Sequence, residues 1–267
     1  MNTATLGHNM KGCGAGWSPE QVIDACAARG FGGVVFWRRE IGGRAQQIGD
    51  RVRASDMQVV GLCRTPYLTG RDAGSDDEVK ASIDMAAALG APVLTIVTGG
   101  TEPGTTGVLE SQKRLAERLS ILAPYAGQRG VKLALEPLNP MFGGNRTCIF
   151  TVADALAVCD MVGLDHLGVA VDVYHVWWDR LLSESLRRAE GRILGFHLCD
   201  WLEDTTDMLL DRGMMGHGVA DLKTLRGLVE GAGYEGFCEV EIFSEKWWST
   251  EPEEVLDLIV ERFRKVC

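Results

Sequence analysis

Apolar residues are distributed along the chain in two alternating patterns. Short, continuous apolar runs alternate with longer segments in which apolar residues recur at helical spacing. Continuous hydrophobicity is typical of strands that are buried on both faces of a parallel sheet. The apolar runs predict eight strands, at residues 3–9, 32–37, 57–63, 91–99, 131–137, 167–175, 192–200 and 236–243.

A helical segment follows each predicted strand. The first has clear boundary signals, because Ser18 can cap its N-terminus, Pro19 suits the first helical position and Gly30 can end it. The predicted helices are residues 18–30, 44–55, 76–90, 109–130, 151–163, 181–191, 221–233 and 250–266.

Eight strand–helix units predict an α/β fold, a single (β/α)₈ TIM barrel. The 267 residues suit this fold, which typically takes about 250. A doubly wound sheet is the alternative, but its first strand would lead into a G-x-G-x-x-G turn, and residues 11–20 read KGCGAGWSPE. Since no linker or change of composition interrupts the chain, we expect one domain over residues 1–267.

Composition narrows the classes of partner. The chain has 27 basic and 37 acidic residues, and a net charge of −10 disfavours a nucleic-acid partner. No apolar run approaches the ~20 residues of a membrane span, and no secretory signal pattern is visible. The eight cysteines are scattered without a C-x-x-C pair, which favours reduced thiols and a cytoplasmic protein.

Ionisable residues interrupt four consecutive apolar strands near their C-terminal ends. They are Glu136, Asp172, His197 and Glu241. Functional groups of TIM barrels lie at this end of the strands, and a buried charge is costly unless it is paired or bound to metal. Three carboxylates and one imidazole predict a site for one divalent metal ion, with Mn²⁺ favoured and Co²⁺, Mg²⁺ or Zn²⁺ as alternatives.

Three polar residues each follow one of these candidate ligands by three positions. Asn139, His175 and Asp200 would lie about 10 Å further along the emerging strands, on the rim of the barrel. We predict that Asn139 and His175 bind substrate, although Asn139 could equally cap a loop. For Asp200 we favour a surface carboxylate, or one that orients a ligand.

Two loops supply further candidates. Arg212, in the Gly-rich segment after the seventh strand, could hold a substrate oxygen or form a salt bridge with Asp207 or Asp211. His8, at the end of the first strand, is a candidate substrate contact. His217 fits a solvated loop position better than the site. His166 precedes the sixth strand and is expected to be structural.

Aromatic residues are concentrated after the second, sixth, seventh and eighth strands. Such residues commonly wall sugar sites, and we predict that Trp37 contacts substrate. Packing between loops, or a homodimer or homotetramer interface, is the alternative for the others. The set is Trp37, Tyr174, Trp177, Trp178, Trp201, Trp247 and Trp248.

Five motifs together resemble a known family. E-P-L-N (136–139), D-x-Y-H (172–175), F-H-x-x-D (196–200), R-G-x-x-G-x-G (212–218) and E-V-E-I-F (239–243) are similar to those of xylose isomerase-like TIM barrels, the sugar phosphate isomerases/epimerases. This superfamily includes ketose 3-epimerases, hydroxypyruvate isomerase, inosose isomerase and dehydratase, and endonuclease IV.

The resemblance implies roles for individual residues. Glu136, Asp172, His197 and Glu241 match the metal ligands, and Glu136 and Glu241 also match the acid–base pair. His175 and Arg212 match residues that hold substrate oxygens in the epimerase branch. That branch has its arginine three residues after the Asp of H-x-x-D, where this chain has Glu203.

The implied activity is isomerisation or epimerisation of a ketose or keto-cyclitol. A proton next to the carbonyl would be removed to give a metal-stabilised enediolate. Without a phosphate-binding loop we expect a non-phosphorylated substrate. The alternatives are an inosose-type dehydratase, a metal-dependent hydrolase or endonuclease-like enzyme, and a non-catalytic sugar-binding subunit. Five histidines are few for the multi-metal endonuclease site.

Overall fold

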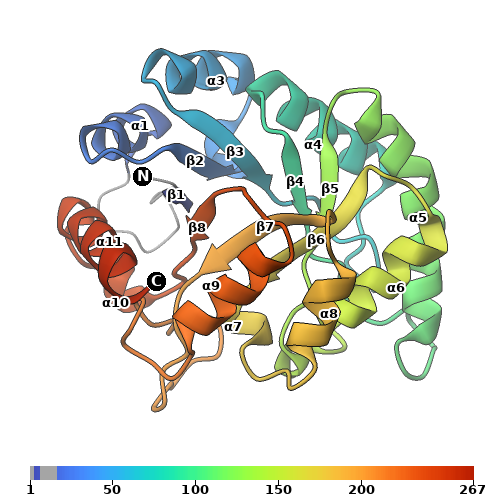
Figure 1. The fold of residues 1–267 in the computed structure, drawn as a ribbon. Coiled ribbons are helices and arrows are strands. Elements are labelled where there is room, and N and C mark those ends of the chain that lie inside the picture. Colours follow the sequence, from blue (N-terminus) through green and yellow to red (C-terminus); the bar gives the residue numbers. More distant parts are fainter. Residues whose placement is uncertain (1–2, 7–16) are drawn as a thin grey trace.

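The computed structural model describes residues 3–6 and 17–267, in which eight parallel strands close into a barrel in sequence order (Figure 1). The first strand closes the ring by pairing with both the second and the eighth. The single TIM barrel predicted from the sequence is confirmed. The strands are β1 (Thr3–Leu6), β2 (Gly33–Trp37), β3 (Gln58–Cys63), β4 (Val93–Ile96), β5 (Lys132–Leu135), β6 (Leu167–Asp172), β7 (Ile193–Leu198) and β8 (Cys238–Val240).

Helices surround the barrel. Ser18 caps the first of them, accepting the N–H of Gln21, and Pro19 is its first residue, as the sequence predicted. The eight longer helices match the predicted segments. They are α1 (Pro19–Ala28), α3 (Ala45–Ala54), α4 (Asp76–Leu89), α5 (Leu109–Gly127), α6 (Val152–Val162), α8 (Leu182–Arg188), α9 (Leu222–Gly231) and α11 (Pro252–Val266).

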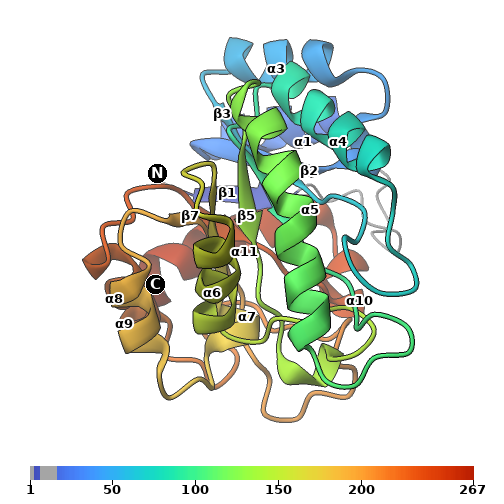
Figure 2. The same ribbon diagram turned by 90° about the vertical axis from the view of Figure 1, so that its right-hand side faces the viewer.

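Four short helical segments were not predicted from the sequence, because one turn is too short to show helical periodicity. They are α2 (Arg38–Ile41), η1 (Pro140–Phe142), α7 (Val173–Val176) and α10 (Glu245–Trp248). Both α7 and α10 lie on the side of the barrel where the strands end, at the lower side of Figure 2. The loops on this side therefore have structure of their own.

The prediction of a strand over residues 167–175 was wrong in its last part. Strand β6 ends at Asp172, and the chain turns directly into α7. The Asp172 carboxylate caps this turn and stabilises it, because its Oδ1 accepts the N–H of Tyr174 at 2.8 Å. Residues after Asp172 are consequently folded back over the barrel mouth.

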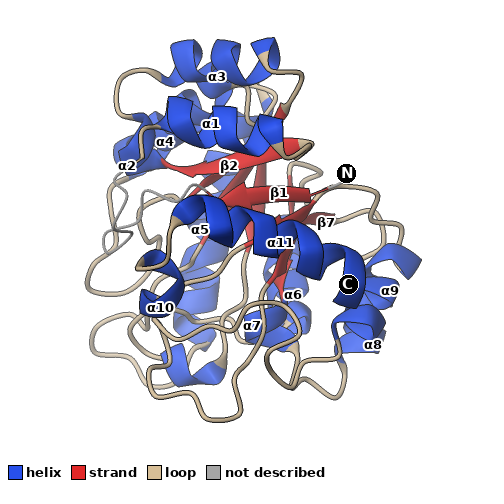
Figure 3. Ribbon diagram, turned by 90° about the vertical axis from the view of Figure 1, so that its left-hand side faces the viewer, coloured by secondary structure: helices blue, strands red, loops and turns tan. Residues whose placement is uncertain are grey.

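The core lies between the strands and the helices. Outward-facing strand residues such as Leu62, Leu94 and Leu133 are fully buried against apolar helix faces. Helix α11 lies beside α1 (Figure 3), and Arg29 joins them through an ion pair with Asp257 at 2.6 Å. This contact closes the helical layer where the first and last of the longer helices meet.

The lengths of the helices and the state of the cysteines can be compared with the expectations from composition. No helix in the described part is long and apolar enough to cross a membrane. The seven cysteines of the described residues are all free thiols.

Candidate metal centre

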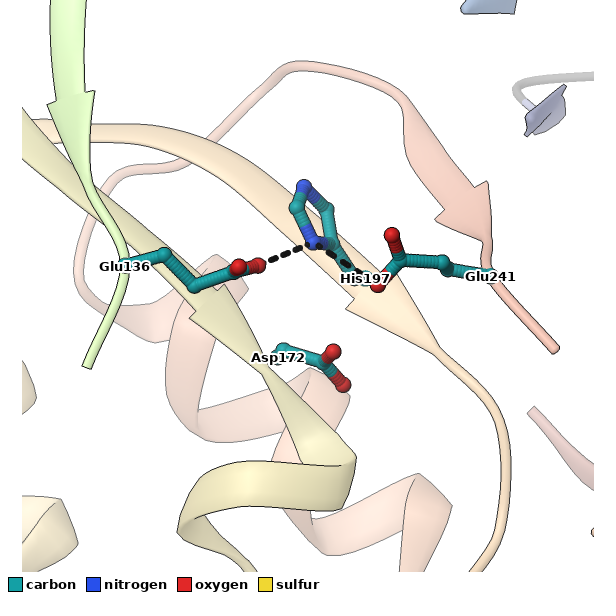
Figure 4. A group of neighbouring side chains, drawn as sticks. All are labelled: Glu136, Asp172, His197 and Glu241. Atoms are coloured by element: carbon teal, nitrogen blue, oxygen red, sulfur yellow. Dashed lines mark ion pairs between the residues drawn. The ribbon is translucent and has the colours of Figure 1, made fainter. Parts of the chain in front are cut away.

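The four predicted ligands converge at the mouth of the barrel (Figure 4). Glu136 and Glu241 directly follow β5 and β8, whereas Asp172 and His197 lie within β6 and β7. Asp172 and His197 are register partners in the sheet. One ligand atom from each of the four lies within 4.8 Å of the others, and all four side chains are buried.

The donor atoms of His197 and Glu136 suit a bound cation. His197 Nδ1 lies 2.8 Å from Glu136 Oε1 and 3.8 Å from Glu241 Oε2. Both Nδ1 and Glu136 Oε1 are buried, yet neither has a partner in hydrogen-bonding geometry. A buried polar atom left without a partner costs about 1–3 kcal/mol. A divalent ion at this point would satisfy both atoms, so the residues fit the metal.

Glu239 is a buried acidic residue of this centre that sequence reasoning missed. Its Oε2 lies 3.4 Å from His197 Nε2, on the other edge of the ring. The two residues are register partners on neighbouring strands. The alternation E-V-E, which places Glu239 and Glu241 on the same face of a strand, was the available signal.

Arg212 contacts two members of the cluster. Its Nη1 donates to Asp172 Oδ2 at 2.8 Å and to Glu241 Oε2 at 3.1 Å. Its guanidinium lies over the Tyr174 ring, 4.4 Å from the centroid. The alternative of a salt bridge with Asp207 or Asp211 is therefore wrong: Arg212 pairs with two of the candidate metal ligands.

The charged groups of the centre shift one another's pKa values. Burial opposes ionisation of Asp172, but Arg212, His175 and His197 outweigh it and lower the pKa of the carboxyl to about 2. Burial likewise opposes protonation of His197, but Glu239, Glu136 and Glu241 raise the pKa of the imidazole well above its usual value. Because a ligating imidazole must be neutral, ion binding at His197 would release a proton.

His175 lies closer to the centre than the sequence predicted. Instead of extending about 10 Å beyond Asp172, it turns back within α7, and its Nε2 lies 3.8 Å from Asp172 Oδ2 and 3.3 Å from Arg212 Nη2. Its Nδ1 accepts the backbone N–H of Asn139 at 3.3 Å. The Asn139 side chain caps η1 by accepting the N–H of Met141, which is the loop-capping alternative.

Asp200 organises the loop that carries Arg212. It is fully buried, which overturns the expectation of a surface carboxylate. Its two oxygens accept the backbone N–H groups of Trp201, Gly216, Gly218 and Ala220 at 2.8–3.1 Å. Two backbone hydrogen bonds also join Asp200 to Gly213, next to Arg212. The carboxylate thus fixes both ends of the loop.

The other predicted site residues fall in different places. Trp37 lines the pocket above the cluster together with Glu136, His175 and Arg212. His217 is exposed and contacts Arg262 and Trp247, away from the cluster. His166 is exposed beside α5. His8 lies outside the described residues.

Several of the predicted aromatic residues pack against other rings. Tyr174, Trp177 and Trp201 form one stack, with ring centroids 4.8 and 5.7 Å apart. Trp248 is buried against Phe243. These contacts favour packing between loops for this part of the aromatic set.

Curated proteins of known name show partial matches. An inosose isomerase of Halalkalibacterium halodurans is 29% identical over 189 residues, covering 67% of this chain and 63% of that protein. A fructoselysine 3-epimerase of Escherichia coli O157:H7 is 29% identical over 191 residues, covering 70% and 65%. The matched region therefore spans less than two-thirds of the length of either relative.

Solved structures match over the whole barrel. Protein SMc04130 of Sinorhizobium meliloti 1021 is 37% identical with a TM-score of 0.91, covering 100% of this chain and 98% of that one. The IolI protein, solved with a zinc atom, has a TM-score of 0.83 at 18% identity, covering 100% and 98%. The family of xylose isomerase-like TIM barrels matches residues 23–266. The chain therefore belongs to the xylose isomerase-like TIM barrel family.

Proposed function

We propose that this protein is a divalent-metal-dependent isomerase or epimerase of a keto sugar or keto-cyclitol. One observation carries the proposal: Glu136 and Glu241 reach the centre of the cluster from opposite sides, with His197 between them (Figure 4). Two carboxylates in this arrangement can exchange protons with two faces, or two neighbouring carbons, of one substrate. The named relatives, an inosose isomerase and a fructoselysine 3-epimerase, support this class of reaction.

Glu136, Asp172, His197 and Glu241 would hold the ion, for which we propose Mn²⁺. When bound, the ion would polarise the substrate carbonyl and stabilise negative charge that develops on its oxygen. One of the two glutamates removes the proton next to the carbonyl, and the other returns a proton. Arg212 and His175 hold substrate oxygens, and Trp37 covers the sugar from the pocket wall.

The fate of the proton decides the reaction. Return to the opposite face of the same carbon gives an epimer. Return to the former carbonyl carbon, with transfer of the hydroxyl proton between the two neighbouring oxygens, gives an aldose from a 2-ketose or moves the carbonyl to the adjacent carbon of a cyclitol. Loss of a β-hydroxyl gives the dehydration product. The products separate these outcomes, since the same two glutamates serve all three.

Metal content tests the site. The purified protein is expected to hold about one divalent ion per chain by elemental analysis. Glu136→Gln and His197→Ala should lose it. Glu203→Gln, in the exposed part of the loop of residues 201–220 (the rim loop), should retain it. Two or three zinc ions per chain would favour the hydrolase alternative. A protein that binds no ion after supplementation would defeat the proposal.

Proton exchange tests the chemistry. Metal-loaded protein in D₂O should introduce deuterium next to the carbonyl of a turned-over keto sugar, as read by NMR. Glu136→Gln and Glu241→Gln should each abolish or strongly slow this exchange. A non-catalytic sugar-binding subunit would bind a sugar without any exchange.

We further propose a cytoplasmic homodimer or homotetramer. Trp178 leaves about a third of its surface exposed beside the barrel mouth, which suits a subunit contact. Sedimentation of a monomer at micromolar concentration would contradict the oligomer.

A further inference from the structure

The pocket above the cluster has an acidic floor and a basic wall. Glu136 and Glu241 contribute to the floor, while two arginines that play no part in the cluster, Arg64 and Arg146, line the wall. Arg64 is the first residue after β3, and Arg146 lies in the loop between η1 and α6. The chain thus brings two guanidinium groups from separate loops to one pocket.

Neither guanidinium forms an ion pair with a carboxylate of the described residues. Arg64 lies over the Tyr67 ring, 4.2 Å from its centroid, and donates to the carbonyl of Thr65 at 3.0 Å. Arg146 lies 5.3 Å from the Phe142 ring centroid, and its Nε is buried without a hydrogen-bond partner. Both side chains are half-buried, so their unused donors are partly removed from water.

The Arg146 backbone is held in place by its surroundings. The Arg146 backbone donates to Phe142 O and accepts from Gly99 N, at 3.1 and 3.0 Å. The Phe142 ring in turn meets His175 edge-on, with centroids 5.8 Å apart. Phe142 therefore links Arg146 to the centre through His175, and a substrate-binding position needs such a defined placement.

Positive charge extends outward from Arg64. A second, more open pocket shares Arg64 with the first, and its lining adds two arginines, Arg38 and Arg39, against one acid, Asp72. Burial and the neighbouring Arg64 lower the pKa of Arg38. In a chain with a net charge of −10, this concentration of arginines at one edge of the mouth attracts anions locally.

We propose that Arg64 and Arg146 form a binding position for an oxyanion of the substrate, a carboxylate or a phosphate ester, on the part of the sugar that points away from the metal centre. Planar guanidinium groups are matched to both kinds of oxyanion. This inference rests on the proposed function and narrows its substrate to acidic keto sugars. The sequence led us to expect a non-phosphorylated substrate. This proposal differs from that expectation, because the oxyanion can be either a carboxylate or a phosphate ester.

Binding of three probes to Mn²⁺-loaded protein tests the proposal by calorimetry. The probes are D-fructose, D-fructose 6-phosphate and 5-keto-D-gluconate, which are neutral, phosphorylated and carboxylated. At least one acidic probe should bind about tenfold or more tighter than fructose. The tighter of the two acidic probes identifies the oxyanion.

The variants Arg64→Met and Arg146→Met should remove that preference. Arg187→Met, on the exposed face of α8, is the matched control and should keep it. Arg146→Lys, which keeps the charge, should retain part of the preference. Unchanged metal content in every variant excludes loss of the fold or of the metal centre.

Equal binding of neutral and acidic probes would overturn the proposal. So would a preference that survives in both methionine variants, since the anion would then be bound by the metal centre alone. Failure of the proposed function is distinguishable, because it appears as absence of deuterium exchange, whereas the oxyanion site is read from binding.

Discussion

Oε2 of Glu239 lies 3.4 Å from Nε2 of His197, whereas Oε1 of Glu136 lies 2.8 Å from Nδ1 of the same ring. Once the imidazole is neutral, as ion binding requires, a carboxylate beside Nε2 would keep the remaining proton on that nitrogen and leave the lone pair of Nδ1 for the ion. Gly195, on the same strand as His197, leaves room for this pair, because a Cβ there would lie 3.3 Å from Nε2. Glu239 is therefore a positioning residue for His197.

Replacing Glu239 should weaken metal binding without removing a ligand. Glu239→Gln is expected to lower the affinity for Mn²⁺ by about 10–100-fold, as loss of such outer partners typically does. Competition with a fluorescent chelator measures this. Glu235→Gln, an exposed position shortly before the same strand, is the control. Equal affinities in the two variants would show that Glu239 does not orient His197.

Arg212 should contribute most to the stability of the fold when the metal is absent. It is the cation that pairs with the fully buried Asp172. Arg212→Met leaves that carboxylate uncompensated, and we expect the free energy of unfolding to fall by about 3–5 kcal/mol. Saturating Mn²⁺ should recover part of this loss, because an ion bound only by the folded state adds stability and supplies positive charge.

Urea unfolding of the Arg212 variant, with and without Mn²⁺, checks this expectation. Arg187→Met serves as the exposed control. If the free energy of unfolding falls by the same amount with and without Mn²⁺, the ion and Arg212 do not compensate the same carboxylates.

Gly218 should be essential to the rim loop. A Cβ at this position would lie 2.0 Å from the carbonyl oxygen of Trp201 and 2.6 Å from Asp200 Oδ1. Gly218→Ala is therefore expected to displace the loop and lower kcat/KM by at least about tenfold, since small misplacements at a site carry such costs.

Kinetics and elemental analysis together check the Gly218 prediction. The metal content should change little, because His197 and Glu136 are held by strands rather than by this loop. Gly227→Ala in α9, where a Cβ meets nothing within 4 Å, is the matched control and should be neutral or stabilising. Full activity of Gly218→Ala would contradict the role of the loop.

Glu40 should make stability depend on pH. Its Oε2 accepts the N–H of Trp37 at 3.0 Å, while its Oε1 is buried without a partner. Burial raises the pKa of this carboxyl to about 7, against an opposing effect of the Trp37 N–H and Arg39. The folded state thus binds more protons than the unfolded chain between about pH 4.5 and 7, so this group makes stability fall as pH rises.

Glu40→Gln should remove this contribution. We expect the stability of the variant relative to the parent protein to increase between about pH 5 and pH 8. Urea unfolding at several pH values measures it, with the exposed Glu203→Gln as reference. Parallel pH profiles of variant and parent would contradict the prediction.

The fold and the ligand cluster could be predicted because both follow from regular patterns. Continuous apolar runs marked the strands, and a charge inside such a run marked Glu136, Asp172, His197 and Glu241. A parallel barrel aligns the ends of its strands, so residues at similar depths on neighbouring strands must meet.

The positions of residues in the loops and short helices after the strands could not be predicted in the same way. The position of His175 depends on a single-turn helix that Asp172 caps, and spacing along a strand gave the wrong distance. The pairing of Arg212 with Asp172 and Glu241 depends on the path of a loop whose hydrogen bonds converge on Asp200. Such contacts join residues far apart in sequence, and no periodic pattern encodes them.

The convergence of four backbone N–H groups on Asp200 has a consequence for how such a barrel can diversify. The bonds fix residues at the two ends of the rim loop, while exposed residues such as Glu203 and Asp204 lie between them. Insertions or replacements in that exposed stretch leave the anchors of Arg212 in place. The exposed stretch is therefore where the substrate preference can change while the ligand cluster and Arg212 keep their positions.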